Sequence, residues 1–482
     1  MPSRTWGAEG VPADLVDALA RLRDELGVPE AFPDDALAEA DRLASDPPDF
    51  ADHRDATDIP FVTIDPASSM DLDQAVHIER TATGFLVHYA IADVGAWVRP
   101  GGAIDAEAHR RGQTYYAPNA KSPLHPPHLS ESAASLLADG RARPAMLWQL
   151  DLDAAGNLVG TQLTRAMVTN REKLSYEGVQ KALDDGSAGE SLQLLREVGT
   201  LRQGTEAARG GVSLNLPEQE VVAEDDHWRL EFRALLPVEN WNAQISLLTG
   251  IAAAQLMIGA KVGVLRTLPP TDKASLNKLR HVATSLGIRW PGGMSYPDFV
   301  RSLDPAKSRH LAMMTACTAL FRGAGYTAFD GRLPDGNLTH AALATPYAHT
   351  TAPLRRLVDR YVLEVCHSIA NGSAIPAWAR QALAALPDEM ATSDARAKKF
   401  ERGVVDLVEV LVLRDRVGES FDGVVTSLDP KRRIGSVQIA DPAVEGQASG
   451  LARNSLGQQV QVTLESADLD QGRIELSGRV DR

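Results

Sequence analysis

Three aspartates lying close together are the residues of this chain whose type and spacing best suit catalysis. Asp65, Asp71 and Asp73 fall within residues 63–75, which read TIDPASSMDLDQA. No Lys or Arg occurs over residues 56–78, so the carboxylates have no basic neighbour along the chain. Hard divalent cations such as Mg²⁺ bind carboxylate, water and phosphate oxygens, and paired cations can hydrolyse a phosphodiester. The spacing alone also fits an acidic turn that caps nearby backbone amides.

The same segment resembles the signature of the ribonuclease II (RNB) exoribonuclease family. That signature has four aspartates, the last two adjacent. Its first three match Asp65, Asp71 and Asp73, and Gln74 stands at the fourth place. The resemblance implies a processive enzyme that hydrolyses RNA from the 3′ end to nucleoside 5′-monophosphates. It also implies that the three aspartates hold Mg²⁺, or Mn²⁺ in its place, with Asp73 the most important for catalysis. Whether Gln74 belongs to the metal shell is left open.

Three later segments extend the resemblance over roughly residues 55–410. By resemblance, Tyr116 stacks on the 3′ end of the RNA. Arg355 stabilises charge as the bond breaks, and Arg356 contacts a neighbouring phosphate. Glu401 corresponds to a glutamate of the active centre. Each residue also has a structural alternative, namely core packing for the tyrosine, a solvated surface for the arginines and helical ion pairs for the glutamate.

Hydrophobic periodicity places these segments in an α+β catalytic domain over residues 53–412. Alternation predicts strands at 76–78 and 85–94, directly after the aspartates, and a hairpin over 149–168. The expected helices lie at 174–209, 239–257, 271–324, 392–412 and from Leu354 onward. The helix at 239–257 has Ala243 and Gln244 where many family members have two acids.

The C-terminal residues 413–482 change character to short strands separated by turns. This pattern predicts an S1-type OB barrel, with which the family also ends. Phe421 is the only aromatic residue in it, so base stacking there is limited. Lys431, Arg432 and Arg433, between the first two strands, could contact phosphates instead.

Residues 1–52 predict a small helical module. Leucines at helical spacing indicate a helix that Gly27 ends, and Pro33 with Asp34 opens a second helix. The pair could resemble a helix-turn-helix, or could be a cap packed on the next domain. Fifty helical residues cannot form the two cold-shock barrels that usually precede the catalytic domain in bacterial members of the family.

Composition sets the remaining bounds. The chain of 482 residues has 44% hydrophobic residues, a formal net charge of −15 and two cysteines, without CxxC spacing. These features predict a cytoplasmic protein without a disulfide framework or zinc ribbon. We expect no signal peptide and no membrane span. The acidic charge is unfavourable for nucleic-acid binding unless basic residues gather locally.

Three functions remain open at this point. The first is an Mg²⁺-dependent 3′-to-5′ exoribonuclease acting on single-stranded RNA or RNA with a 3′ overhang, without an obligatory protein partner. The second is a non-catalytic RNA-binding descendant of that family, in which Gln74 and Gln244 mark lost acids. The third is a DNA-binding regulator that uses the N-terminal helices.

Overall fold

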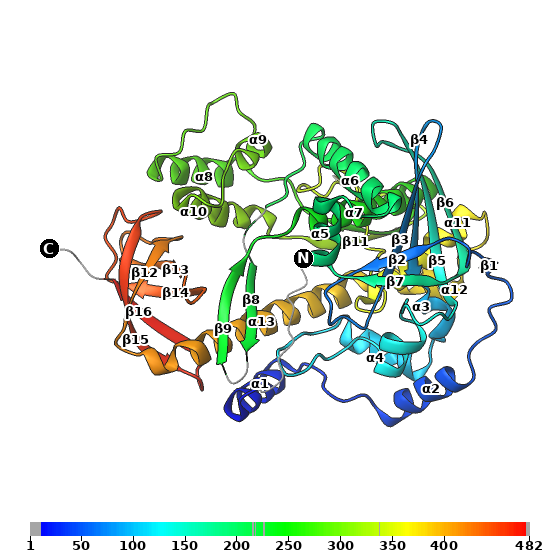
Figure 1. Ribbon diagram of the computed structural model, residues 1–482, viewed down its shortest axis with the longest axis horizontal. Coiled ribbons are helices and arrows are strands. Elements are labelled where there is room, and N and C mark those ends of the chain that lie inside the picture. Colours follow the sequence, from blue (N-terminus) through cyan, green and yellow to red (C-terminus); the bar gives the residue numbers. More distant parts are fainter. Residues whose placement is uncertain (1–10, 215, 217, 225–226, 337, 479–482) are drawn as a thin grey trace.

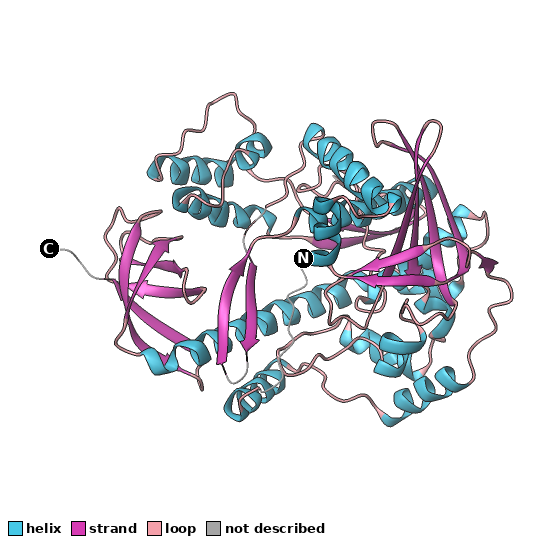
Figure 2. Cartoon of the chain, in the orientation of Figure 1, coloured by secondary structure: helices cyan, strands magenta, loops and turns pink. Residues whose placement is uncertain are grey.

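A long helix joins a large sheet-and-helix body to a small β-barrel (Figure 1, Figure 2). The structure is a computed structural model and describes residues 11–214, 216, 218–224, 227–336 and 338–478. The connecting helix is α13, Leu386–Leu413. The sheet lies at one end of the molecule and the barrel at the other, which confirms the predicted α+β architecture (Figure 2).

The body is built on a seven-stranded sheet of order β1-β6-β5-β4-β3-β2-β7. Neighbouring strands are antiparallel except for the pairs β1–β6 and β2–β7, which are parallel. The strands are β1 Arg54–Asp55, β2 Phe61–Ile64, β3 Gln74–Arg80, β4 Gly84–Ala92, β5 Arg143–Asp153, β6 Leu158–Val168 and β7 Asn170–Leu174. Because side chains alternate across a strand, Tyr89 and Ile91 of β4 enter the main core, whereas Ala90 and Ala92 enter a second core behind the sheet.

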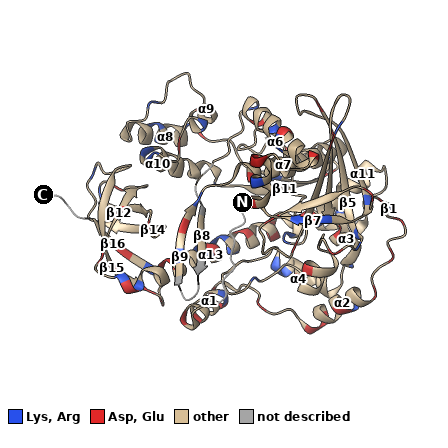
Figure 3. Cartoon of the chain, viewed as in Figure 1, with Lys and Arg blue, Asp and Glu red and all other residues tan. Residues whose placement is uncertain are grey.

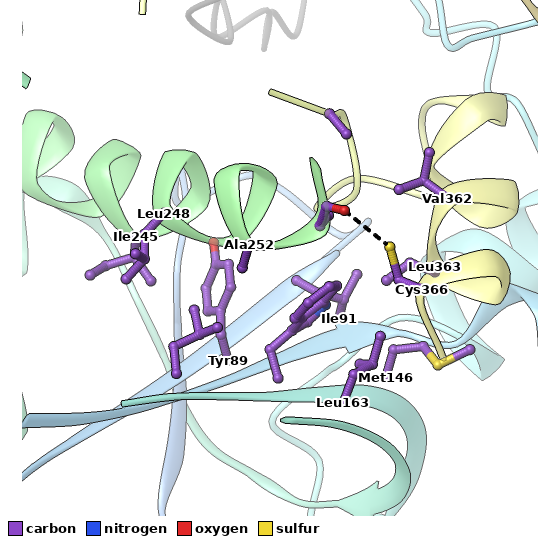
Figure 4. Packing of buried hydrophobic residues seen from close by; sticks show 14 of the residues in the cluster. Tyr89, Ile91, Met146, Leu163, Ile245, Leu248, Ala252, Val362, Leu363 and Cys366 are labelled. Carbon is purple, nitrogen blue, oxygen red and sulfur yellow. Dashed lines mark hydrogen bonds between the residues drawn. The ribbon is translucent and has the colours of Figure 1, made fainter. Parts of the chain in front are cut away.

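Helices cover the front of this sheet: α5 Tyr176–Asp185, α6 Glu190–Ala208, α7 Pro237–Ala260 and α11 Leu357–Ala370. Within the described part of the chain, α7 is the one helix long and apolar enough to cross a membrane. Leu248, Ala252 and Met257 of α7 are fully or almost fully buried in the main core. Figure 4 shows α7 lying over Tyr89 and Ile91, with α11 beside it. This packing accounts for the apolar sequence of α7 as that of a core helix.

The rest of the body is made of shorter elements. A two-stranded sheet pairs β10, Val262–Thr267, with β11, Gly325–Asp330. A hairpin, β8 Glu218–Glu224 and β9 His227–Arg233, lies beside α13 (Figure 1). The remaining helices are α3 Val94–Trp97, α4 Ala103–Arg111, α8 Lys273–Ser285, α9 Tyr296–Arg301, α10 Ser308–Cys317 and α12 Ala377–Ala382, with short turns Leu129–Ala133, Thr318–Phe321 and Arg414–Arg416.

The C-terminal strands close into a five-stranded barrel of order β12-β13-β14-β16-β15, as the OB prediction requires. They are β12 Ser420–Val425, β13 Ile434–Ile439, β14 Val444–Ser449, β15 Gln459–Asp468 and β16 Arg473–Gly478. The barrel shares a hydrophobic core with α13 and with the β8–β9 hairpin. Its Ala443 N–H donates to Leu230 O of β9 at 2.9 Å. The hairpin was not predicted from the sequence.

The two predicted N-terminal helices are present as α1, Ala13–Leu26, and α2, Asp34–Ser45. They belong to different cores. Leu15 and Leu19 of α1 pack with α13 and the barrel, whereas Ala36 and Ala40 of α2 pack behind the large sheet. This arrangement favours a cap on the catalytic domain over a helix-turn-helix, in which the two helices pack on each other.

Gly250 allows α7 to approach the segment that leads to α11. A Cβ atom at Gly250 would lie 2.2 Å from Tyr347 Cε2 and 2.5 Å from Ala348 O. We expect Gly250→Ala to lower the free energy of unfolding by about 1–3 kcal/mol, because a packed core does not accept extra volume. Gly259→Ala in the same helix meets no atom within 4 Å. It should be neutral or stabilising by up to ~1 kcal/mol, since alanine favours a helix. Urea denaturation measures both, and equal effects would contradict the close approach.

Candidate active site

The acidic segment is an ordered loop between β2 and β3. Lys173 Nζ donates to Ala67 O and to Ser69 O, both at 2.6 Å. On the other side, Ser135 Oγ donates to Met70 O at 2.7 Å and accepts from Leu72 N–H at 2.9 Å. Leu72, which lies between Asp71 and Asp73, is fully buried. The loop therefore presents its aspartates in fixed positions.

Asp73 connects this loop to the arginine segment. Its carboxylate is buried and accepts a hydrogen bond from Leu354 N–H at 2.7 Å. Arg355 Nε lies 3.4 Å from its other oxygen. Burial raises the pKa of Asp73, while the guanidinium and the N–H oppose that rise by stabilising the charged form. Two motifs 281 residues apart in the sequence thus meet at one carboxylate.

The two arginines precede α11, which begins at Leu357 and not, as predicted, at Leu354. Arg356 is bound to Asp359 by two hydrogen bonds of 2.5 and 2.8 Å. Asp359 also accepts from Ala352 N–H at 2.8 Å, so this pair shapes the turn. Asp359 is thus a structural partner of Arg356, whose phosphate contact stays a prediction. The Arg355 side chain is more exposed, at 37% against 22% for Arg356.

The tyrosine pair divides between the core and the site. Tyr115 is 2% exposed and donates to Arg111 O at 3.0 Å. The Tyr116 hydroxyl lies 3.5 Å from Asp71 Oδ2. Lys121, on the same loop, donates to Asp71 Oδ1 at 3.0 Å. Tyr116 is therefore placed beside the aspartates, and Lys121 is a site residue that sequence reasoning missed.

Asp65 is a second buried aspartate whose charged form a cation would stabilise. Burial, helped by the nearby Asp71, raises its pKa to about 7, while Arg355 and Lys173 act in the opposite direction. Next to it, Gln74 Oε1 accepts a hydrogen bond from the hydroxyl of Tyr89. The Gln74 amide is thus tied to the sheet.

Two further side chains, Tyr176 and Asn242, lie near Asp65. Tyr176 of α5 hydrogen-bonds to Asn242 of α7, and burial and the charge of Asp65 both raise its pKa. Asn242 Nδ2 lies 3.5 Å from Ile64 O, the residue before Asp65. The sequence could have indicated these two residues only weakly, by a tyrosine at the start of a predicted helix and an asparagine within an apolar helix. Gln244, two residues after Asn242, is buried, and its Nε2 donates to Glu206 Oε2 at 2.6 Å.

The donor chemistry fits a hard divalent cation held by few protein ligands. Within the described residues, no group of three or more His, Cys, Asp or Glu side chains is arranged to hold one metal ion. Two of the three predicted aspartates have partners that compete with a cation or orient them for one: Asp73 faces the Leu354–Arg355 turn, and Asp71 pairs with Lys121. The metal set of Asp65, Asp71 and Asp73 stays a prediction. Mg²⁺ commonly binds through one or two carboxylates, with water and substrate phosphate completing its shell.

Glu401 lies on α13, and its predicted role at the active centre stays a prediction. It lines a cavity of about 360 Å³ together with Gln219 of β8 and Glu445 of the barrel. Seven residues earlier, about 10 Å along the helix, Asp394 accepts from Arg266 Nη1 at 3.0 Å and from Gln113 Nε2 at 3.5 Å. Gln113 in turn forms a backbone bridge with Arg356. The carboxylate that α13 extends toward the arginine turn is therefore Asp394.

Comparison with known proteins agrees with this geometry. The model of the RNB domain matches residues 53–372. The chain belongs to the RNB family. A second model, the RNase II-type exonuclease C-terminal S1 domain, matches residues 419–478 and covers the barrel. Both findings confirm the family that the sequence motifs indicated.

Individual relatives and solved structures that resemble this chain are ribonucleases R and a pseudonuclease. It is 27% identical to Ribonuclease R of Escherichia coli over 471 residues, which covers 88% of this chain and 57% of that protein. The fold matches Mycoplasma genitalium RNase R in complex with ribose-methylated single-stranded RNA, with a TM-score of 0.86, 19% identity and coverage of 97% and 78%. It also matches yeast Ssd1, a pseudonuclease, with a TM-score of 0.68, 17% identity and coverage of 84% and 51%.

Gln74 offers a direct test of cation binding at this site. A carboxylate in its place adds a charge beside Asp65, so we expect Gln74→Asp to bind Mn²⁺ about 10-fold more tightly without RNA, worth about 1.4 kcal/mol. In RNA cleavage, half-maximal activity should need more Mg²⁺ in the wild type, and the difference should shrink at saturating RNA. Electron paramagnetic resonance of free Mn²⁺ measures the first effect and initial rates measure the second. Superimposed curves would place Gln74 outside the cation's reach. Tyr89→Phe, which only frees the amide, is the matched control.

Proposed function

We propose that this protein is a hydrolytic 3′-to-5′ exoribonuclease that acts processively on single-stranded RNA or on RNA with a 3′ overhang. One observation carries the proposal. The acidic loop, Arg355 and Tyr116 come from three distant segments and meet around Asp73 and Asp71. Carboxylates, a guanidinium and an aromatic ring in one place suit a terminal nucleotide and its phosphate. The relationship to Ribonuclease R supports the same activity.

Each of these side chains has a physical role in the proposed reaction. A divalent cation, Mg²⁺ or Mn²⁺, held by Asp65 and Asp71 would supply positive charge at the phosphate and lower the pKa of a water molecule. Arg355, partly exposed and oriented by Asp73, donates hydrogen bonds to phosphate oxygens. Tyr116 provides a ring on which the 3′-terminal base stacks. The products are nucleoside 5′-monophosphates.

The deciding experiment is a time course on RNA labelled at its 5′ end. One substrate is single-stranded, a second is a duplex with a 3′ tail, and a third carries a blocked 3′ end. Conversion of the first to a short labelled end product with few intermediate lengths, and with the blocked RNA intact, supports the proposal. Cleavage of the blocked RNA at internal positions, or no shortening in Mg²⁺ or Mn²⁺, refutes it.

A non-catalytic RNA-binding protein is the second candidate, and Gln74 is the observation that favours it, because the site lacks one acid of the family signature. The match to a pseudonuclease shows that this fold also occurs in a protein so described. RNA retained on the protein without shortening would select this function. A DNA-binding regulator has less support, since α1 and α2 pack into separate cores.

Asp73→Asn should separate chemistry from binding. The amide can still accept from Leu354 N–H but no longer attracts Arg355, so the arginine loses the charge that orients it. We expect turnover to fall by at least about 10²-fold while RNA affinity changes little. Single-turnover kinetics and filter binding measure the two quantities.

Asp151→Asn is the control for this substitution, because Asp151 and Asp153 form a similar D-x-D pair on the β5–β6 hairpin. Its turnover should stay within about 2-fold of the wild type. Near-normal turnover of Asp73→Asn would remove Asp73 from the reaction.

Tyr116→Ala should change the smallest product left after exhaustive digestion. Loss of one base stack weakens binding of the 3′ end by roughly 1–3 kcal/mol, which lets short oligomers leave earlier. Tyr116→Phe keeps the ring and should keep the product length. Tyr115→Phe, which removes a core hydrogen bond, should lower stability without changing the product. If Tyr116→Ala leaves the same end product, the Tyr116 ring does not stack on the 3′-terminal base.

A further inference from the structure

The N-terminal segment 13–32 contacts the catalytic domain in a way that a simple cap does not require. α1 lies against α13 at a point where Gly403 leaves room for it, since a Cβ there would be 2.8 Å from Leu22 Cδ1. The same contact places α1 next to the loop 116–121, which carries Tyr116 and Lys121. Both of these residues approach Asp71.

Arg23 of α1 makes the connection to that loop. It is 3% exposed, and its Nη2 donates to Asn119 Oδ1 at 2.9 Å and to Ala120 O at 3.1 Å. Its Cζ atom also lies 5.7 Å from the centre of the Phe400 ring of α13. Burying a guanidinium is unfavourable unless its donors find partners. The partners here are atoms of the loop, so the loop cannot move away from α1 without leaving these donors unsatisfied.

A second buried arginine ties the other end of the loop to the same segment. Arg111 of α4 is fully buried and donates to Pro123 O at 3.1 Å, to Pro29 O at 3.3 Å and to Ala31 O at 2.7 Å. The loop is thus held at residues 119–120 by α1 and at residue 123 through the segment that follows α1. Tyr116 and Lys121 lie between or beside these anchor points.

We propose that the segment 13–32 is a positioning element of the active site, and that Arg23 is its positioning residue for Tyr116. This inference rests on the proposed exoribonuclease function and deepens it. The N-terminal helix sets where the 3′-terminal base stacks, without touching the RNA. Loosening the loop should therefore affect the geometry of the terminal nucleotide more than the affinity for the rest of the strand.

The test uses the full-length protein carrying Asp73→Asn, so that RNA is bound but not consumed. The probe is an RNA with 2-aminopurine as its 3′-terminal base, whose fluorescence is quenched by stacking. Arg23→Met removes the donors and the charge but keeps an unbranched apolar side chain. Arg21→Met, on the same helix, removes an exposed ion pair with Asp470 and is the matched control. Tyr116→Ala defines the unstacked signal.

We expect Arg23→Met to lose at least half of the quenching, while Arg21→Met keeps it. Arg23→Lys keeps a positively charged donor group without the planar guanidinium and should give an intermediate signal. In the catalytically intact background, Arg23→Met should lower kcat by about 10-fold and change KM by less than about 3-fold, because a misplaced group mainly reduces the rate of the chemical step. Hydrogen exchange of residues 113–122, measured without RNA, should become faster in Arg23→Met alone.

The positioning role would be overturned if Arg23→Met showed the same quenching and the same hydrogen exchange as Arg21→Met. If Arg23→Met does not fold, Arg23→Lys decides in the same way, since quenching and exchange there equal to those in Arg21→Met would contradict the need for the guanidinium. Failure of the wild-type protein to shorten RNA refutes the proposed function instead. Even then, hydrogen exchange of residues 113–122 shows whether Arg23 holds the loop in place.

Discussion

The active site depends on a buried carboxylate that is shared between two loops. Asp73 accepts from Leu354 N–H and faces Arg355, so it fixes the acidic loop against the turn before α11. A carboxylate removed from water is unfavourable without such partners. Neither loop can shift without separating this pair, and the position of Arg355 follows from it. The bond between Arg356 and Asp359 then holds the same turn from its other side.

This local arrangement explains how an acidic protein can be suited to RNA. The net charge of −15 gives no general attraction for phosphate. Figure 3 shows basic and acidic residues interspersed along most elements. At the site, however, Arg355, Lys121 and Lys173 all come within the influence of the three aspartates. In the proposed enzyme, recognition of the terminal phosphate would therefore depend on short-range hydrogen bonds and a cation, with little help from long-range steering.

The sequence predicted the features that depend on local patterns and failed where distant contacts decide. The OB strands, α1, α2 and α7 followed from periodicity and turn residues. Glu401 was predicted by its resemblance to the family's Glu-Arg pair, and its role stays a prediction. Only the packing of α13 shows that Asp394, two turns earlier, faces Gln113 and Arg266. Arg356 could not be separated from Arg355 by spacing, because its partner Asp359 is brought within reach by the start of α11. The β8–β9 hairpin was missed because it is stabilised by contacts with the barrel.

Gln74 changes the charge balance of the site in a way that the fold alone does not reveal. Arg355, Lys121 and Lys173 lie near the three aspartates, and Glu131 adds a further carboxylate 3.1 Å from Lys121. A carboxylate at position 74 would add negative charge to this buried space, and a divalent cation would then relieve a larger repulsion. With glutamine there, that contribution is missing, and the amide is held by Tyr89 instead. In the proposed enzyme, the cation would therefore depend more on the phosphates of the RNA itself. Metal binding and RNA binding would then be coupled, each strengthening the other by the same free energy.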